Sequence, residues 1–126
     1  MNRVVITGMG AITPLGNTVT EFWDGIKNGK NGIAAITNFD ASETGISVAG
    51  EVKDFDATKY MDRKEYKRMD LFSQYAVAAS AQAVEQSGID MEKIDADRFG
   101  VTIGSGVGGF ITMESGIIKM HEKGPK

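Results

Sequence analysis

One stretch, residues 62–88, constrains the fold of this chain more than any other. Its second half is rich in small side chains, namely Ala76, Ala78, Ala79, Ser80, Ala81 and Ala83. Alanine is the strongest helix former, and Gly88 suits the left-handed residue at which many helices end. A helix without bulky side chains lets neighbouring backbones approach closely. We therefore predict one long helix over residues 62–88, with a central and mostly buried second half.

The first half of the same stretch carries concentrated positive charge. Its basic side chains, called the basic segment below, are Arg63, Lys64, Lys67 and Arg68. At about 100° per residue they share one side of a helix. Residues 59–68 hold five basic and two acidic side chains, although the whole chain has a net charge of −3. This asymmetry indicates a binding surface for an acidic partner and supplies no catalyst. The alternative is a solvated face, since most surface charges contribute little.

Composition and length exclude several classes of protein. A chain of 126 residues suffices for one domain, and without repeats or linkers we expect no internal boundary within residues 1–126. The net negative charge argues against nucleic-acid binding. No apolar run is long enough to span a membrane and no signal peptide is apparent, so we expect a cytoplasmic protein. The absence of cysteine excludes disulfides, thiolate metal sites and a cysteine nucleophile here. We expect no metal and no cofactor.

Hydrophobic runs on both sides of the long helix predict an α/β fold. Residues 4–6 and 99–103 read as buried strands, and a strand, a helix and a second strand imply a right-handed parallel crossover. A short strand is expected over residues 48–52. Further helices are predicted over residues 21–27, capped by Thr18 or Thr20, and over residues 111–122. Because only two convincing parallel strands are present, we expect an N-terminal fragment of a larger fold.

Two glycine clusters raise the possibility of a nucleotide site. Gly8 and Gly10 follow the first predicted strand, but Thr13 replaces the third glycine of a dinucleotide fingerprint and Pro14 opposes entry into a helix. Residues 104–109 contain four glycines, yet no lysine follows as in a phosphate loop. For this second cluster, a ligand-binding turn at a strand end and a close-packing seam both remain open.

Three blocks of sequence together resemble the β-ketoacyl-[acyl-carrier-protein] synthase II family, the condensing enzymes of bacterial fatty-acid elongation. The blocks are RVVITGMGAITPLGN at residues 3–17, DRKEYKRMDLFSQYA at residues 62–76 and VTIGSGVGG at residues 101–109. The resemblance implies a thiolase-like layered α/β fold in a homodimer. This chain would be an incomplete N-terminal half, with a mostly parallel sheet and packed helices.

The family reaction is a decarboxylative Claisen condensation between acyl and malonyl thioesters of acyl carrier protein. The resemblance implies a cysteine nucleophile and two histidines that stabilise the developing negative charge. None of these positions falls in this chain, so we expect residues 1–126 alone to be inactive. The single histidine, His121, matches no family catalytic position and is interpreted as a solvated surface residue.

The resemblance also implies binding residues. Lys64, Lys67 and Arg68 match positions that contact the acidic helix of acyl carrier protein, and Arg63 joins them by helical geometry. Lys126 matches a further basic position of that surface. Val107 matches an apolar residue that lines the acyl-chain pocket. Two other functions remain as alternatives: a stand-alone carrier-docking module and, less favoured, a nucleotide-binding domain.

Overall fold

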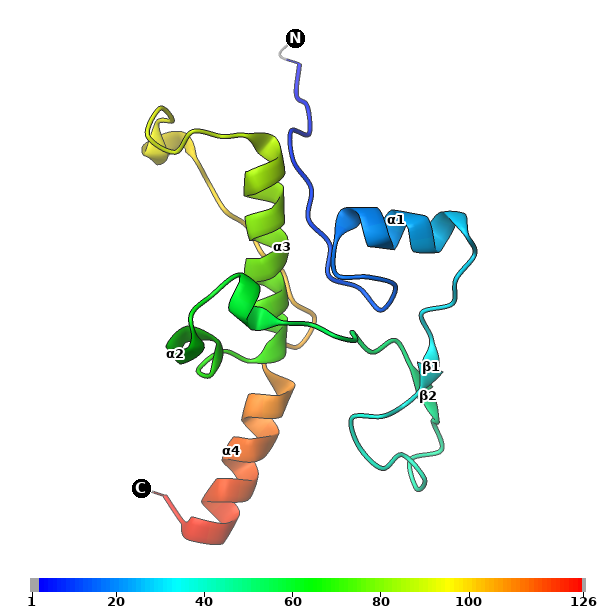
Figure 1. Cartoon of the computed structure of the whole chain (residues 1–126). Coiled ribbons are helices and arrows are strands. Elements are labelled where there is room, and N and C mark those ends of the chain that lie inside the picture. Colours follow the sequence, from blue (N-terminus) through cyan, green and yellow to red (C-terminus); the bar gives the residue numbers. More distant parts are fainter. Residues whose placement is uncertain (1–2, 126) are drawn as a thin grey trace.

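The computed structural model describes residues 3–125, whose regular secondary structure is mainly helical and is joined by long irregular segments (Figure 1). The elements in chain order are α1 (Val19–Lys27), β1 (Ala34–Ala35), β2 (Val48–Ala49), the 3₁₀ turn η1 (Ala57–Lys59), α2 (Arg63–Tyr66), α3 (Leu71–Ser87), the 3₁₀ turn η2 (Ala96–Arg98) and α4 (Phe110–Lys123). Helix α3 is central, with α1 and the β1–β2 pair on one side and α2 on the other. Helix α4 begins near the end at which α3 starts.

The N-terminal segment packs directly against the backbone of α3. A Cβ atom at Gly8 would overlap the carbonyl oxygen of Ala83, and one at Gly10 would overlap that of Ala79. The side chain of Gln82 accepts a hydrogen bond from the Ala11 amide at 3.1 Å. The predicted close approach to the small-residue helix is therefore confirmed. It also explains the Gly8–Gly10 pair by packing, without a bound dinucleotide.

The prediction of one helix over residues 62–88 is wrong, because the chain breaks between α2 and α3. Asp70 has an extended backbone, with φ −66° and ψ 157°. Helix α3 then starts at Leu71 and ends, as predicted, at the left-handed Gly88. Helix propensity alone does not account for the break. Side-chain hydrogen bonds made by Gln74 and Asp70 hold the non-helical turn in place, and these bonds are described with the site below.

The predicted burial of α3 is also only partly confirmed. Ala78 is fully buried and Gln74 is 8% exposed, and they are the only buried residues of this helix. The apolar side chains of Leu71, Phe72 and Val77 are each at least 36% exposed. Large apolar surfaces of the central helix thus remain uncovered by the rest of residues 3–125.

The two predicted parallel strands are not formed. Residues 4–6 and 99–103 run past α3 as irregular segments, and the only sheet within residues 3–125 is the antiparallel β1–β2 pair, in which Ala34 faces Ala49. Val4 is 92% exposed and Val101 73% exposed. A strand needs a neighbouring backbone to complete its hydrogen bonds, and neither segment lies beside such a partner here. The crossover and the mostly parallel sheet are therefore absent from the described residues.

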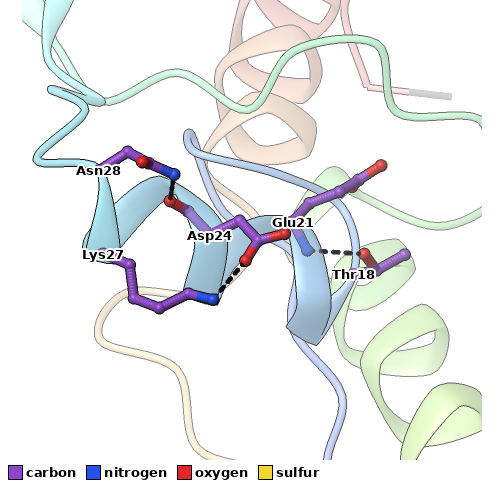
Figure 2. Close-up of polar contacts among 5 residues, drawn as sticks. All are labelled: Thr18, Glu21, Asp24, Lys27 and Asn28. Atoms are coloured by element: carbon purple, nitrogen blue, oxygen red, sulfur yellow. Dashed lines mark hydrogen bonds and ion pairs between the residues drawn. The ribbon is translucent and has the colours of Figure 1, made fainter.

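The local predictions at helix ends are confirmed. Thr18 caps α1 by accepting a hydrogen bond from the Glu21 amide, and Lys27 pairs with Asp24 at 2.8 Å in the last turn (Figure 2). Helix α4 contains the predicted residues 111–122 and ends at Gly124, whose φ is 72°. Strand β2 lies within the expected residues 48–52. Within residues 3–125, no helix combines the length and the apolar character needed to cross a bilayer.

Candidate functional site

The basic segment begins at a complete capping box. The Asp62 carboxylate accepts hydrogen bonds from the amides of Lys64 at 2.7 Å and Glu65 at 2.9 Å. The Glu65 carboxylate in turn accepts one from the Asp62 amide at 3.2 Å. This reciprocal arrangement is what allows a helix of only four residues to start here. The Asp62 carboxylate thus binds two backbone amides of α2, and the Glu65 carboxylate binds the amide of the N-cap residue.

The four cations of the basic segment are all exposed. The ion pairs among residues 3–125 are Lys27–Asp24 and Lys93–Asp90, and neither includes a member of the basic segment. Arg63 and Lys64 lie in α2, Lys67 caps its C-terminal end, and Arg68 lies in the turn that follows. The structure thus brings the predicted cations together on one short helix and its turn, rather than along one long helix face.

A buried glutamine attaches the basic segment to α3. The Gln74 amide nitrogen donates to the carbonyl oxygens of Tyr66 at 3.0 Å and Met69 at 2.9 Å. These carbonyls belong to the end of α2 and the following turn, where backbone acceptors lose their intrahelical partners. Gln74 was missed in the sequence. It is one of several polar residues in the sequence of α3, and nothing in the sequence marks it as buried or reveals its partners.

Aromatic packing lies next to this attachment. The Phe55 ring meets the Tyr75 ring edge to face, with centroids 4.9 Å apart, and stacks on Tyr60 at 6.4 Å. Partial burial raises the pKa of the Tyr75 hydroxyl. The loop before α2 is therefore packed against α3 as well.

A second link joins the start of α3 to the start of α4. Asp70 occupies the N-cap position of α3 but makes no side-chain bond to that helix. Its Oδ2 atom accepts hydrogen bonds from the Thr112 amide at 2.8 Å and the Thr112 hydroxyl at 2.7 Å. These two bonds, the hydroxyl bond first, lower the pKa of the Asp70 carboxyl. The N-cap residue of α4 itself, Gly109, has no side chain, so Asp70 caps α4 from a different helix.

The glycine-rich turn, residues 104–109, leads directly into α4. Gly108 adopts a left-handed φ of +80°, and its amide donates to the Ser105 hydroxyl at 3.0 Å. A Cβ atom at Gly104, Gly106 or Gly108 would meet nothing within 4 Å. These three glycines therefore form no close-packing seam within residues 3–125, and a ligand-binding turn stays a prediction. Val107 lies in this turn and is 65% exposed.

The remaining predicted residues add no chemistry to the site. Lys126 lies outside the described residues. His121 is exposed on α4, in agreement with its interpretation as a surface residue. In the part of the chain that the structure describes, no cluster of histidine and carboxylate side chains could hold a metal ion.

Comparisons with known proteins identify the family. Residues 1–125 match the model of the N-terminal domain of β-ketoacyl synthases. The chain is 50% identical over 123 residues to a 3-oxoacyl-[acyl-carrier-protein] synthase 2 from Synechocystis sp., covering 98% of this chain and 30% of that relative.

Solved structures agree with this match. The ishigamide ketosynthase/chain length factor superposes with a TM-score of 0.78 at 30% identity, over 95% of this chain and 30% of that one. A type II polyketide ketosynthase, AntDE, solved with its acyl carrier protein AntF, gives a TM-score of 0.75 at 29% identity, over the same shares of the two chains. The expected fold class, a partial N-terminal portion of the thiolase-like α/β fold, is thereby confirmed. The chain spans about 30% of the length of these relatives, and it belongs to the β-ketoacyl synthase family, whose N-terminal domain it matches.

Proposed function

We propose that the protein to which these residues belong is a 3-oxoacyl-[acyl-carrier-protein] synthase of type II. It would condense acyl thioesters of acyl carrier protein with malonyl carrier protein in fatty-acid elongation. The observation that carries this proposal is the identity of 50% to such an enzyme along 98% of the chain. Cytoplasmic location and a homodimeric full-length enzyme belong to the same proposal.

The proposed chemistry divides between this chain and the rest of the enzyme. Transfer of the acyl group to the enzyme needs a nucleophile, and a cysteine thiolate is the expected group. Residues 1–126 contain no cysteine. We therefore expect these residues alone to bind without catalysing condensation, and the catalytic cysteine and histidines to lie elsewhere in the full-length enzyme.

The proposed role of the basic segment is to dock acyl carrier protein. Four exposed cations lie on a short helix and the turn that follows it, and the carboxylates of Asp62 and Glu65 bind backbone amides at the start of that helix. The capping box and Gln74 hold this helix in one place against α3. A fixed cluster of positive charge without an ion pair among residues 3–125 suits an acidic partner, and such complementarity steers and orients the partner more than it adds affinity. The ketosynthase AntDE was solved with a carrier protein bound, which supports this kind of partner.

Val107 is the proposed contact for the acyl chain. Its apolar side chain lies in the glycine-rich turn and is largely exposed within residues 3–125. Helix α4, which follows, carries an open apolar groove lined by Phe110, Ile111, Met113, Glu114, Ile117 and Ile118. We propose that the acyl chain and other parts of the dimeric enzyme cover these surfaces.

Steady-state condensation by the full-length enzyme tests the proposed function. We expect it to form a β-ketoacyl product from acyl and malonyl carrier proteins, and residues 1–126 to form none. Reversing charge at Lys64, Lys67 and Arg68 should raise KM for the acyl carrier protein, with a smaller effect on a small-molecule thioester. Added salt should raise the wild-type KM as well, because exposed charges more than about 8–10 Å apart are screened.

A matched control separates docking from net charge. Reversing the exposed Lys30, Lys53 and Lys93 changes the net charge by the same amount on other segments. We expect little change in KM for that variant. Equal losses with both kinds of substrate, or equal losses in the two triple variants, would contradict the docking role. A full-length protein that forms no β-ketoacyl product would contradict the proposed function itself.

A further inference from the structure

The glycine-rich turn and α4 are tethered to the rest of the molecule at a single point. Of the hydrogen bonds among residues 3–125, only the two from Thr112 to Asp70 connect residues 100–125 with an earlier part of the chain. The other side-chain hydrogen bonds of residues 99–125, such as those of Ser105 and Ser115, are local. The placement of the turn relative to α3 therefore depends on one carboxylate.

The two hydrogen bonds between Thr112 and Asp70, called the tether below, lie between the proposed docking segment and the proposed acyl-chain contact. Asp70 follows Arg68 by two residues, and Thr112 lies in the first turn of α4, directly after the glycine-rich turn. Figure 1 shows α4 beginning close to the start of α3. The short path from the basic segment to Val107 thus passes through the bonds between Asp70 and Thr112.

The local geometry is fitted to this contact. Gly109 lies against the carboxylate, and a Cβ atom there would be 3.1 Å from Asp70 Oδ2. The carboxylate receives the third amide of α4, which has no intrahelical partner, and the negative charge faces the positive end of the helix dipole. Hydrogen bonds to an ionised acceptor are stronger than neutral ones. On the other side, Gln74 holds the turn that precedes Asp70.

We propose that Asp70 is a positioning residue that sets the place of the glycine-rich turn relative to the docking helix, and so contributes to the selection of acyl-chain length. This inference rests on the proposed function. Asp70 itself touches neither the carrier protein nor the acyl chain. It acts through Thr112, by fixing the first turn of α4 and with it the position of Val107.

The test compares full-length wild type with Asp70→Ala on a short and a long saturated acyl carrier protein. Removal of the carboxylate should change the ratio of the two kcat/KM values by about tenfold, the lower end of what one methylene contributes to discrimination in an apolar pocket. The inhibition constant of unloaded carrier protein should stay at its wild-type value, because the basic segment is retained. Asp70→Asn, which keeps an acceptor oxygen, should restore most of the wild-type ratio. Thr112→Val, which removes one of the two bonds, should give an intermediate ratio.

Glu51 provides a matched control with the same bonding chemistry. Its carboxylate accepts hydrogen bonds from the amide and hydroxyl of Thr37, beside the β1–β2 pair. Glu51→Ala should therefore leave the chain-length ratio unchanged. An equal loss of kcat/KM for both chain lengths in Asp70→Ala, or an equal shift of the ratio in Glu51→Ala, would overturn the positioning role.

Hydrogen exchange separates this inference from the proposed function. Amides of residues 104–115 should exchange faster in Asp70→Ala than in wild type, and at the wild-type rate in Glu51→Ala. Unchanged exchange in Asp70→Ala would refute the tether whether or not the protein condenses thioesters. A wild-type protein without condensing activity would refute the proposed function, and the exchange rates would still decide the structural part of the inference.

Discussion

At the scale of single residues, Gly10 shows how one missing side chain determines a contact. The segment around it crosses α3 so closely that a Cβ atom would overlap the carbonyl oxygen of Ala79. The backbone of Gly10 has an ordinary negative-φ conformation. Glycine is therefore required here because a side chain would not fit, rather than for an unusual backbone conformation. The small side chains of α3 allow the two backbones to come this close.

Gly10→Ala in the proposed full-length enzyme should lower the free energy of unfolding by at least about 1–3 kcal/mol, the usual cost of overpacking. The methyl group would meet backbone atoms, which cannot rotate away as a side chain can. Gly104→Ala is the control, because a Cβ atom there meets nothing within 4 Å. Its effect should stay within about 0.5 kcal/mol. Urea unfolding curves measure the free energy of unfolding of both variants. Similar unfolding midpoints for Gly10→Ala and Gly104→Ala would contradict the packing explanation.

At the scale of elements, the break between α2 and α3 decides how the basic segment is presented. In one continuous helix over residues 62–88, the cations would lie on the same helix axis as the small residues. Instead, α2 is a separate helix of four residues beside α3. The buried Gln74 completes the hydrogen bonds that the break leaves open.

Gln74→Leu tests this role of the glutamine. The substitution leaves the carbonyl oxygen of Met69 without a partner, while that of Tyr66 keeps only its bond from the Met69 amide. This loss should cost about 1–3 kcal/mol of unfolding free energy. Amides of residues 62–70 should also exchange faster. Gln86→Leu serves as the control, since Gln86 is exposed and water can replace its bond to the Met9 amide. An equal effect of both substitutions would show that the attachment of α2 does not depend on Gln74.

At the scale of the whole molecule, the described residues leave much apolar surface uncovered. Ile6 is 83% exposed in the N-terminal segment, and Ile117 and Ile118 are at least 50% exposed on α4. Contiguous apolar surface of this kind usually marks an interface or a tendency to associate. In the proposed enzyme, the rest of the chain and the second subunit would cover it.

We therefore expect isolated residues 1–126 to self-associate or to be poorly soluble. Sedimentation velocity should show species larger than a monomer, increasing with protein concentration. Replacing Ile117 and Ile118 with Glu should reduce association, whereas Ser115→Glu on the same helix should not. A stable monomer at high concentration would contradict this expectation.

The family was predictable from three short blocks of the sequence, and the helix ends were predictable because they depend on residues within one turn. Thr18 caps α1 with its side chain, and Gly88 and Gly124 end α3 and α4 because they lack one. Each of these residues bonds backbone groups within about one helical turn, so the residue type alone indicates the helix end. The cations of the basic segment were also identified in advance, because their charge and spacing are visible in the chain.

The sequence by itself therefore determined the small-residue helix, its capacity for close backbone packing and the membership of the β-ketoacyl synthase family, whereas the structure showed that Gly8 and Gly10 make the close contact. Only the tertiary structure decided that the predicted long helix breaks, that Gln74 holds the break and that Asp70 caps α4. It also decided that residues 4–6 and 99–103 remain unpaired within the described chain. The physical reason is that hydrogen bonds between distant segments, unlike helix caps, depend on which groups the fold brings together.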